Sequence, residues 1–565
     1  MAKQVPYTSR RSPALGLNGC VSTDQPLATA AALEILRKGG NAVDAAIAGA
    51  AVLQVVEPYA TGIGGDCFCL FYDATSKSVK CINGSGKSPS KLTLELVNAR
   101  GYNEAHPLDD STGLSATVPG AAKGWYDSYG SFGSKKVTMT EILEPAIGYA
   151  EKGFPVGPMN SFQWAVYRPK LLSMHGGKAF LINGTDTPAP GTVLRNVPLA
   201  NVLKRLAHEG PSAIYRGDVA QSIVDAAVGG VLSLKDLEDH LASNETPRVT
   251  PLSTKYHGVT VYTTPPPSHG AVFLEALNIL EGYNLKEYGP ASAEYLHLMI
   301  ESLRLSFADG LSYVADMSSG SYKDVFKMTC KDYAAGRRGL IHLDSVADIQ
   351  VPVSAPDQSH TTFLVTADAN GNACSFINSN FKGFGCSIVE PHGFALHCRG
   401  LGFNLIPGHP NCVGPRKTPY HTLMPVMVTD SSNGQLMAAM GTMGGYGQPQ
   451  QNLRVLLNML EMKMDPQEAV DAPRTLIGSG ITIHPNDDLL VEEGLPDETL
   501  RGLKERGHKI KGILTGSERR SMGHYHVVAR GNWWSTDNNM LPAGDEASVY
   551  WAGCDPRCDG VAAAI

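Results

Sequence analysis

The chain has 565 residues, of which 43% are hydrophobic and 18% are charged, so it can build a sizeable core and is not expected to be disordered. Its net charge of −7 gives no basic surface for nucleic acid, and no stretch approaches the roughly 20 apolar residues that span a bilayer. The 60 glycines and 36 prolines favour many tight turns over a helical bundle. We expect a globular protein with neither a nucleic acid nor a membrane partner.

The cysteines and the first residues predict a cytoplasmic protein. The eleven cysteines are odd in number and scattered, which does not favour a secreted disulfide framework. The segment from Met1 to Pro13 contains no apolar signal core. We therefore expect a soluble chain in the cytoplasm.

The first elements in chain order are two helices and two strands. Apolar residues at helical spacing predict a helix from Gln25 to Lys38. Asn41 can cap a second helix, Ala42 to Leu53, whose many alanines predict tight packing and full burial. Strands are predicted at Cys67–Tyr72 and Val79–Asn83. Helices followed by a β meander indicate a layered α/β fold.

The middle of the chain, from about residue 120 to 340, is predicted to be predominantly helical. A polar, proline-bearing stretch from Asp344 to Gln358 then predicts an exposed loop. At the end of that loop, the residues from Gln358 to Cys374 read as strand, turn and strand. A further helix is predicted near Gln451 to Met464.

Two groups of residues suggest ligand sites but do not fit the known spacings. The run from Asn83 to Ser88 resembles a phosphate-binding loop, but Cys81 stands where that pattern needs a glycine. Five potential metal ligands match no zinc spacing, namely His392, His397, Cys398, His409 and Cys412. Cys554 and Cys558 are expected to be free thiols. No metal and no other cofactor is predicted.

Thr361 and Thr362 open the strand that follows the exposed loop. A threonine pair in a strand is common, and a threonine hydroxyl is a weak nucleophile unless a base takes its proton. If the bond between His360 and Thr361 were cut, the freed α-amino group would be that base, since it titrates at roughly 7.7–8.0. Attack of the Thr361 hydroxyl on the His360 carbonyl would make the cut. One hydroxyl would then serve both maturation and turnover.

A tetrahedral intermediate on that hydroxyl needs hydrogen-bond donors for its oxyanion. Gly444 and Gly445 offer two successive backbone N–H groups that no side chain obstructs. A glycine pair alone is most often a turn. Together with the threonine motif, it favours an oxyanion site.

These motifs, in this order, resemble the γ-glutamyltransferase family of N-terminal-nucleophile hydrolases. The resemblance runs from about Gly16 to the C-terminus. It includes Val55–Pro58, Gly62–Gly65, Thr117–Trp125, Glu144–Ala146, Phe154–Val156, Pro265–Ser268, Gly383–Gly385, Gly441–Gly445 and Asp555–Arg557. It implies a four-layer αββα sandwich with the nucleophile on a central strand.

The resemblance also implies a division of the chain and roles for several residues. Cleavage would leave a large chain of residues 1–360, with the loop before the nucleophile at about 344–360, and a small chain of residues 361–565. The two chains would share one core and stay associated, with a higher oligomer left open. Ser379 matches a hydroxyl that hydrogen-bonds the nucleophile's amino group, and Thr422 matches the second of two hydroxyl residues that line the site. Gly444 and Gly445 match the oxyanion glycines.

The departures from the family pattern fall at the positions that hold the substrate. Ser85 replaces the arginine that binds the substrate's α-carboxylate, and Gly402 replaces the acidic residue that binds its α-ammonium. Phe381 replaces an asparagine, although Asn380 is adjacent, and His421 replaces the first of two serines.

Arg399 is the candidate that these departures leave for substrate binding. It lies three residues before Gly402 and is either a bidentate carboxylate ligand or a surface arginine. This pattern is similar to the subgroup called cephalosporin-acylase-like or glutathione-hydrolase-like.

The function implied is an autoprocessed amidohydrolase that cleaves γ-glutamyl amides, or similar carboxylate-bearing acyl amides of small molecules, through an acyl-enzyme on Thr361. Transfer to an amino acid acceptor is less favoured than hydrolysis. Two alternatives stay open. One is an unprocessed, catalytically silent homologue that acts as a binding or structural protein, and the other is an acylase for acyl amides that are not amino acid derivatives.

Overall fold

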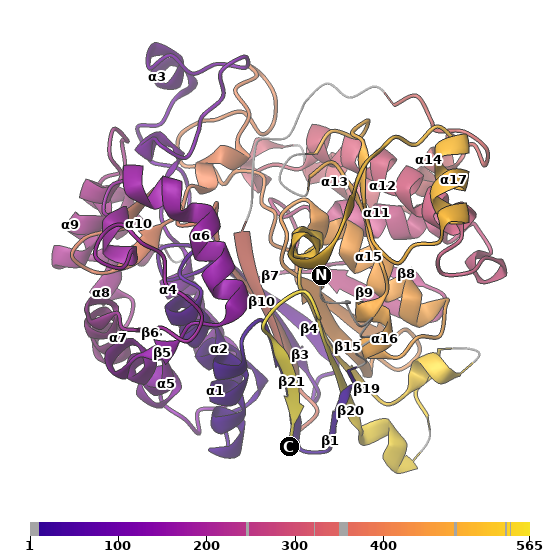
Figure 1. Ribbon diagram of the computed structural model, residues 1–565, viewed down its shortest axis with the longest axis horizontal. Coiled ribbons are helices and arrows are strands. Elements are labelled where there is room, and N and C mark those ends of the chain that lie inside the picture. Colours follow the sequence, from indigo (N-terminus) through magenta and orange to yellow (C-terminus); the bar gives the residue numbers. More distant parts are fainter. Residues whose placement is uncertain are drawn as a thin grey trace, which may run out of the picture.

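The computed structural model describes residues 11–243, 248–320, 322–349, 360–479, 483–536, 539–542 and 544–565. Two seven-stranded sheets lie face to face in the middle of the molecule, and helices cover the outer face of each (Figure 1). The four-layer αββα sandwich expected from the sequence is confirmed. Within the described part of the chain, no helix is long and apolar enough to cross a membrane.

Both sheets combine strands from before and after residue 361. The β10 sheet has the order β21 (Val561–Ala564), β2 (Gly19–Thr23), β10 (His360–Asp368), β11 (Ala373–Phe381), β3 (Asp66–Asp73), β4 (Ser78–Gly84) and β7 (Arg248–Val249). The β15 sheet has the order β1 (Ala14–Gly16), β20 (Tyr550–Cys554), β19 (Tyr525–Arg530), β15 (Leu436–Thr442), β14 (Val426–Asp430), β9 (Val259–Thr263) and β8 (Leu252–Tyr256). Strand β10 therefore has a neighbouring strand on each side, and it is covered on one face by the β15 sheet and on the other by helices.

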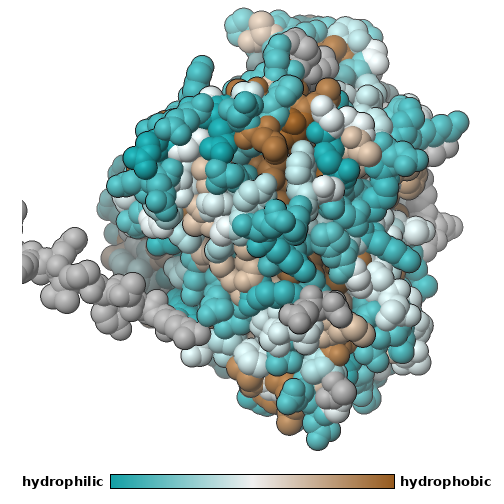
Figure 2. Space-filling view, turned by 90° about the vertical axis from the view of Figure 1, so that its right-hand side faces the viewer, coloured by the Kyte–Doolittle hydropathy of each residue, from teal (hydrophilic) through white to brown (hydrophobic). Residues whose placement is uncertain are grey.

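Two groups of helices form the outer layers. The β10 sheet is covered by α1 (Pro26–Arg37), α2 (Ala42–Val56) and α4 (Ala121–Phe132), with α3 (Leu94–Ala99), α5 (Met139–Lys152), α6 (Pro158–Ser173), α7 (Val197–Glu209), α8 (Ser212–Tyr215), α9 (Gly217–Ala226) and α10 (Leu234–Ala242) on the same side (Figure 1). The β15 sheet is covered by α11 (Gly270–Leu280), α15 (Gly447–Leu460) and α16 (Pro466–Asp471), with α12 (Ala293–Tyr313), α13 (Tyr322–Met328), α14 (Lys331–Arg338) and α17 (Asp497–Glu505) around them. The side that carries α14 and α17 is mostly hydrophilic, with small hydrophobic areas between the polar side chains (Figure 2).

Helix α2 follows from its sequence. The Asn41 side chain accepts hydrogen bonds from Val43 N and Asp44 N, while Asp44 Oδ2 accepts one from Asn41 N. This capping box satisfies the N–H groups that a helix leaves unpaired at its start. All 15 residues of α2 are buried, because small alanines let the helix lie between α1, α5 and the sheet. The predicted cap and burial are confirmed, and the helix continues from Leu53 to Val56 before the predicted stop at Pro58.

The structure differs from the sequence prediction at two places. The predominantly helical middle of the chain also contains the hairpin of β8 and β9, whose residues alternate between buried and less buried positions. Helix α15 begins at Gly447, four residues earlier than predicted, and ends at Leu460, before the left-handed Lys463. The loop before Thr361 has no helix or strand from residue 342 to 349, and residues 350–359 lie outside the described part.

Candidate active site

Thr361 lies at a bulge near the start of β10. His360 pairs with Phe381 and Thr362 pairs with Asn378, so two steps along β10 face three along β11. A bulge of this kind turns a side chain away from the regular alternation of a strand. The Thr361 hydroxyl donates a hydrogen bond to Ser379 Oγ at 3.1 Å, and Thr361 is only 1% exposed. The structure therefore brings the predicted nucleophile and Ser379 together.

Ser379 is itself fixed by the turn that ends β11. Its Oγ accepts a hydrogen bond from Phe381 N at 2.9 Å, and Phe381 has a positive φ of 70°. Phe381 stands where the family pattern has an asparagine. Here it supplies a ring face and a backbone donor instead of an amide side chain.

Gly444 and Gly445 connect the facing sheet to a helix. They follow β15, precede α15, and have φ values of 124° and 55°. Their backbone N–H groups donate to no acceptor that the structure describes. A helix N-terminus carries a partial positive charge, so this turn favours an anion.

Contacts between the two sheets connect this turn to the nucleophile strand. Gly441 lies against the Phe363 ring, since a Cβ at Gly441 would be 2.6 Å from that ring. Phe363 N in turn donates to Asp24 Oδ2 at 3.3 Å, and Asp24 Oδ1 lies 3.1 Å from His524 Nδ1. Met443 N donates to the His524 carbonyl at 3.2 Å. The glycine turn is thus fixed relative to β10 through Asp24 and His524.

Asp66 is the centre of a buried polar network that the sequence analysis did not identify. It opens β3 directly opposite Ser379. Its Oδ1 accepts from Gly86 N at 3.2 Å and Gly120 N at 3.1 Å. Its Oδ2 lies 3.1 Å from His421 Nε2, and 3.5 Å from both His397 Nδ1 and Arg399 Nε.

The network holds Asp66 ionised. Burial raises the pKa of Asp66, but His397, His421 and Arg399 together lower it to about 2. His421 is neutral, because its Nδ1 accepts from Leu423 N at 3.2 Å and its Nε2–H faces Asp66. Burial lowers the pKa of His421 to about 3. The signal for Asp66 in the sequence is a lone acidic residue after Gly64-Gly65, at the start of an apolar strand.

Arg399 is fully buried, so its interpretation as a surface arginine is wrong. Its guanidinium lies 4.5 Å from the centre of the Phe381 ring, and Nη1 donates to Thr422 Oγ1 at 3.3 Å. Its Nε forms an ion pair with Asp66 without hydrogen-bond geometry, and Nη2 has no acceptor among the described residues. Burial lowers the pKa of Arg399 to about 10, which leaves it charged at neutral pH. The Nη2 edge of the guanidinium group is therefore available to a ligand anion.

His269 joins this group without any signal in the sequence beyond its place after Pro265–Ser268. Its ring is fully buried against Tyr420 and Tyr446, at centroid distances of 5.7 and 6.3 Å. Neither ring nitrogen has a partner among the described residues. Burial lowers the pKa of His269 to about 3, so the ring is neutral.

Two of the predicted substrate-binding residues lie in other contacts. Asn380 donates from Nδ2 to the Pro58 carbonyl at 3.2 Å and packs against Gly65. Ser85 donates to Asn83 Oδ1 at 2.6 Å and lines a cavity of about 710 Å³. Neither Thr361 nor Arg399 lines that cavity. The side chain of His360 and residues 350–359 lie outside the described part, which leaves the His360–Thr361 junction as a prediction.

Comparisons with known proteins identify the family. Residues 28–565 match the family model described as gamma-glutamyltranspeptidase. The glutathione hydrolase-like YwrD proenzyme of Bacillus subtilis is 32% identical over 98% of this chain and 99% of its own. The acylase ACY 1 proenzyme of Pseudomonas sp. (strain V22) is 32% identical over 89% of each chain. The crystal structure of cephalosporin acylase from Bacillus halodurans superposes with a TM-score of 0.86 at 35% identity, over 100% of this chain and 99% of that one. This chain belongs to the gamma-glutamyltranspeptidase family.

Proposed function

We propose that the chain is a self-processing amidohydrolase that cleaves small acyl amides whose acyl group carries a carboxylate, such as γ-glutamyl amides. The single observation that carries the proposal is that Phe381 links the two halves of the site: its N–H binds Ser379, which accepts from Thr361, and its ring lies against Arg399, whose Nη2 has no acceptor among the described residues. The names of the relatives, glutathione hydrolase-like and acylase proenzymes, support the same class of reaction.

The reaction would run through an ester on Thr361. The hydroxyl oxygen attacks the amide carbon of the substrate while its proton passes to the α-amino group of the new N-terminus. The N–H groups of Gly444 and Gly445 would stabilise the oxyanion. Collapse breaks the C–N bond, and the amine leaves with the proton from the α-ammonium. Water then hydrolyses the ester and restores Thr361.

Maturation would use the same hydroxyl on the His360 carbonyl. The test is the intact mass of the purified protein under denaturing conditions, beside Thr361→Ala and a control, Thr362→Ala. We expect two masses, for residues 1–360 and 361–565, in the wild type and the control, and one uncut mass in Thr361→Ala. A Thr361→Ala protein with activity would overturn the proposal. A wild type that stays uncut after long incubation would favour a silent homologue.

A second candidate, an acylase for dicarboxylic amides, is favoured by the engagement of Asp66. Its carboxylate already faces two histidines, an arginine and two backbone N–H groups, so it is not available for an α-ammonium group. Hydrolysis rates on glutaryl and γ-glutamyl anilides separate the candidates. Equal or faster glutaryl hydrolysis supports the acylase, and a strong γ-glutamyl preference supports the γ-glutamyl hydrolase.

We also propose that the two chains stay together after cleavage and work in the cytoplasm. Both seven-stranded sheets contain strands from before and after residue 361 in the sequence. Separation of the two chains would therefore expose the core of each sheet to water. All eleven cysteines are unpaired thiols, as in a reducing compartment. Gel filtration of the cleaved protein, with the mass of each chain, tests the association.

A further inference from the structure

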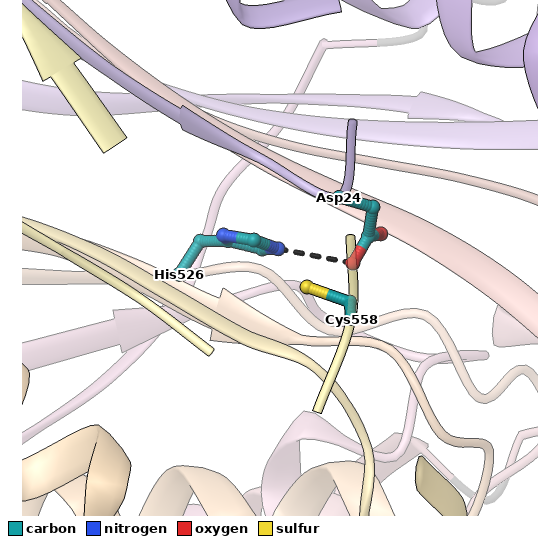
Figure 3. A group of neighbouring side chains, drawn as sticks. All are labelled: Asp24, His526 and Cys558. Carbon is teal, nitrogen blue, oxygen red and sulfur yellow. Dashed lines mark hydrogen bonds and ion pairs between the residues drawn. The ribbon is translucent and has the colours of Figure 1, made fainter. Parts of the chain in front are cut away.

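Asp24, His526 and Cys558 bring a carboxylate, an imidazole and a thiol together beside the nucleophile strand. Asp24 follows β2, His526 belongs to β19, and Cys558 lies between β20 and β21. Their three ligand atoms lie within 4.8 Å of one another, and the side chains converge on one point (Figure 3). All three are buried, with Asp24 and His526 fully so and Cys558 at 6% exposure. Spacing along the sequence could not reveal this cluster, because about 500 residues separate Asp24 from the other two.

The hydrogen bonds around His526 define a place for a positive charge. The Ser22 hydroxyl has one proton, which it donates to the Gly553 carbonyl at 2.9 Å. Ser22 Oγ must therefore accept from His526 Nδ1 at 2.8 Å. The other ring nitrogen, Nε2, lies 3.1 Å from Asp24 Oδ1. Two lone pairs cannot face each other at that distance, so either a second proton or a metal cation has to stand between Nε2 and the carboxylate.

Cys554 lies near the cluster but outside it. It is 2% exposed, and its thiol donates to the Thr23 and Asp555 carbonyls at 3.9 Å each. Cys558 Sγ donates to the Asp555 carbonyl at 3.3 Å and accepts from Gly560 N at 3.4 Å. Among the described residues, Cys558 is therefore the thiol that lies with Asp24 and His526.

We propose that Asp24, His526 and Cys558 bind a thiophilic divalent cation of the zinc class. A thiolate, an imidazole nitrogen and a carboxylate oxygen are ligand types that zinc takes, and a site with three protein ligands leaves the fourth tetrahedral position to water. On binding, the cation replaces the proton on His526 Nε2 and the proton on the Cys558 thiol. Asp24 Oδ2 accepts from Phe363 N at 3.3 Å, so the cation fixes the C-terminal segment to β10, two residues after Thr361. The site takes no part in acyl transfer and is independent of the proposed function.

A second group of potential ligands consists of His297, Glu301 and His508. Unlike the cluster at His526, it needs no cation to complete its hydrogen bonds. The Glu301 oxygens already accept from Arg304 Nη1 at 2.6 Å and Ala347 N at 2.7 Å. His297 bonds the His342 carbonyl with one ring nitrogen and His508 with the other. Ordinary hydrogen bonds account for this group, and it contains no sulfur.

Cobalt titration of the whole protein, stripped with a chelator, tests the proposal. Because Co²⁺ bound by thiolates in a tetrahedral site gives charge-transfer bands in the near ultraviolet and strong visible bands, we expect both to saturate at one equivalent and to vanish on adding Zn²⁺. Cys558→Ser should weaken binding at least about tenfold. The exposed Cys330 is the matched control, and Cys330→Ser should bind as the wild type does. Absence of thiolate bands, or bands that persist in Cys558→Ser, would overturn the proposal.

Alkylation of the unmodified wild type provides a test without variants. Iodoacetamide labelling followed by peptide mass mapping reports each thiol separately. We expect Zn²⁺ to protect Cys558 at least about tenfold while labelling of Cys330 stays the same. Equal labelling of Cys558 with and without Zn²⁺ contradicts the site, whatever the catalytic activity of the protein.

Discussion

A buried guanidinium group needs an anion and hydrogen-bond acceptors to replace the water that it loses. The chain provides only some of these partners to Arg399. Asp66 faces its Nε at 3.5 Å but also serves His421 and two backbone N–H groups. Nη2 has no acceptor among the described residues. A buried polar group without a partner costs free energy, and a ligand carboxylate would remove that cost.

Arg399→Lys should therefore impair the carboxylate-bearing substrates selectively. Lysine keeps the charge but loses the planar fork, which binds a carboxylate through two parallel hydrogen bonds. We expect kcat/KM on a glutaryl anilide to fall roughly 10- to 100-fold, equivalent to about 1.5–3 kcal/mol for a charged hydrogen bond. Steady-state kinetics measure this, with a butyryl anilide as the substrate that has no carboxylate.

The control for this substitution is Arg416→Lys, since Arg416 is exposed and lines the cavity near Ser85 rather than the Thr361 site. It should leave both rates unchanged. An Arg399→Lys enzyme that loses activity equally on both anilides would show that Arg399 supports the fold and does not bind the carboxylate.

His421 makes the stability of the protein depend on pH. Its pKa in the folded protein is about 3, below the ordinary histidine value of about 6.5, because burial disfavours the charged ring. The unfolded chain therefore binds a proton first as the pH falls, so stability is complete above about pH 6.5 and is lost progressively toward pH 3. Between pH 7 and 5 the loss from His421 alone amounts to about 2 kcal/mol.

His421→Gln should reduce this loss, because glutamine can donate to Asp66 and has no charge to gain. We expect the difference in unfolding midpoint between pH 7 and pH 5 to be smaller than in the wild type, as measured by thermal unfolding followed by circular dichroism. His208, which is exposed on α7, provides the matched control, His208→Gln. Identical pH dependence in wild type and His421→Gln would mean that His421 is protonated in the folded protein.

At the scale of the elements, the turn between β15 and α15 depends on backbone conformations that only glycine adopts easily. Gly444 has φ 124°, which an L side chain rarely adopts. Gly444→Ala should rotate this peptide and move the N–H groups away from the oxyanion. We expect kcat to fall roughly 10²–10³-fold with a smaller change in KM, as for the loss of one oxyanion donor.

A second glycine separates this effect from simple strain. Gly408 has φ 81° in a loop with nothing within 4 Å of a Cβ. Gly408→Ala carries comparable backbone strain away from the site, so kcat should stay near the wild-type value. Equal losses of kcat in both variants would argue against an oxyanion role for Gly444.

The sequence predicts the elements whose determinants are local. The Asn41 cap, the alanines of α2 and the β10–β11 hairpin are all encoded within a few neighbouring residues, and the structure contains each of them. The hairpin of β8 and β9 was missed although its alternation was present, because the helical character of the surrounding segments dominated the interpretation. Asp66 and His269 were missed for a different reason. The charged and aromatic side chains that they contact lie more than 100 positions away in the sequence, and no local pattern encodes such contacts.

At the scale of the whole molecule, the segment before the nucleophile is fastened to the part of the chain after it. Val346 N donates to the Arg506 carbonyl at 2.9 Å, and Arg506 Nε donates to the Leu343 carbonyl at 3.1 Å. Asn486 Nδ2 donates to the Ile349 carbonyl at 2.9 Å. After cleavage, these bonds would hold the new C-terminal tail beside the small chain.

The buried pair of Glu301 and Arg304 supports this attachment. Arg304 binds Glu301 Oε1 and Asn486 Oδ1, each at 2.6 Å, and Glu301 Oε2 accepts from Ala347 N at 2.7 Å. Both side chains are under 10% exposed. Removing one partner of a buried ion pair leaves the other charge uncompensated, at a cost of about 3–5 kcal/mol.

Arg304→Leu should therefore lower the unfolding midpoint and release the tail. We expect trypsin to cut after Arg338, the last lysine or arginine before Thr361, faster in this variant, with a larger effect in the cleaved protein than in the Thr361→Ala precursor. In the precursor the segment is still joined to Thr361 by the peptide chain. Loss of the contacts made by Glu301 and Arg304 therefore frees it less. The exposed pair of Arg205 and Asp218 gives the control, because Arg205→Leu removes a surface ion pair worth at most about 1 kcal/mol. Equal trypsin sensitivity of cleaved and uncleaved Arg304→Leu would mean that the Glu301–Arg304 pair stabilises α12 alone and does not retain the tail.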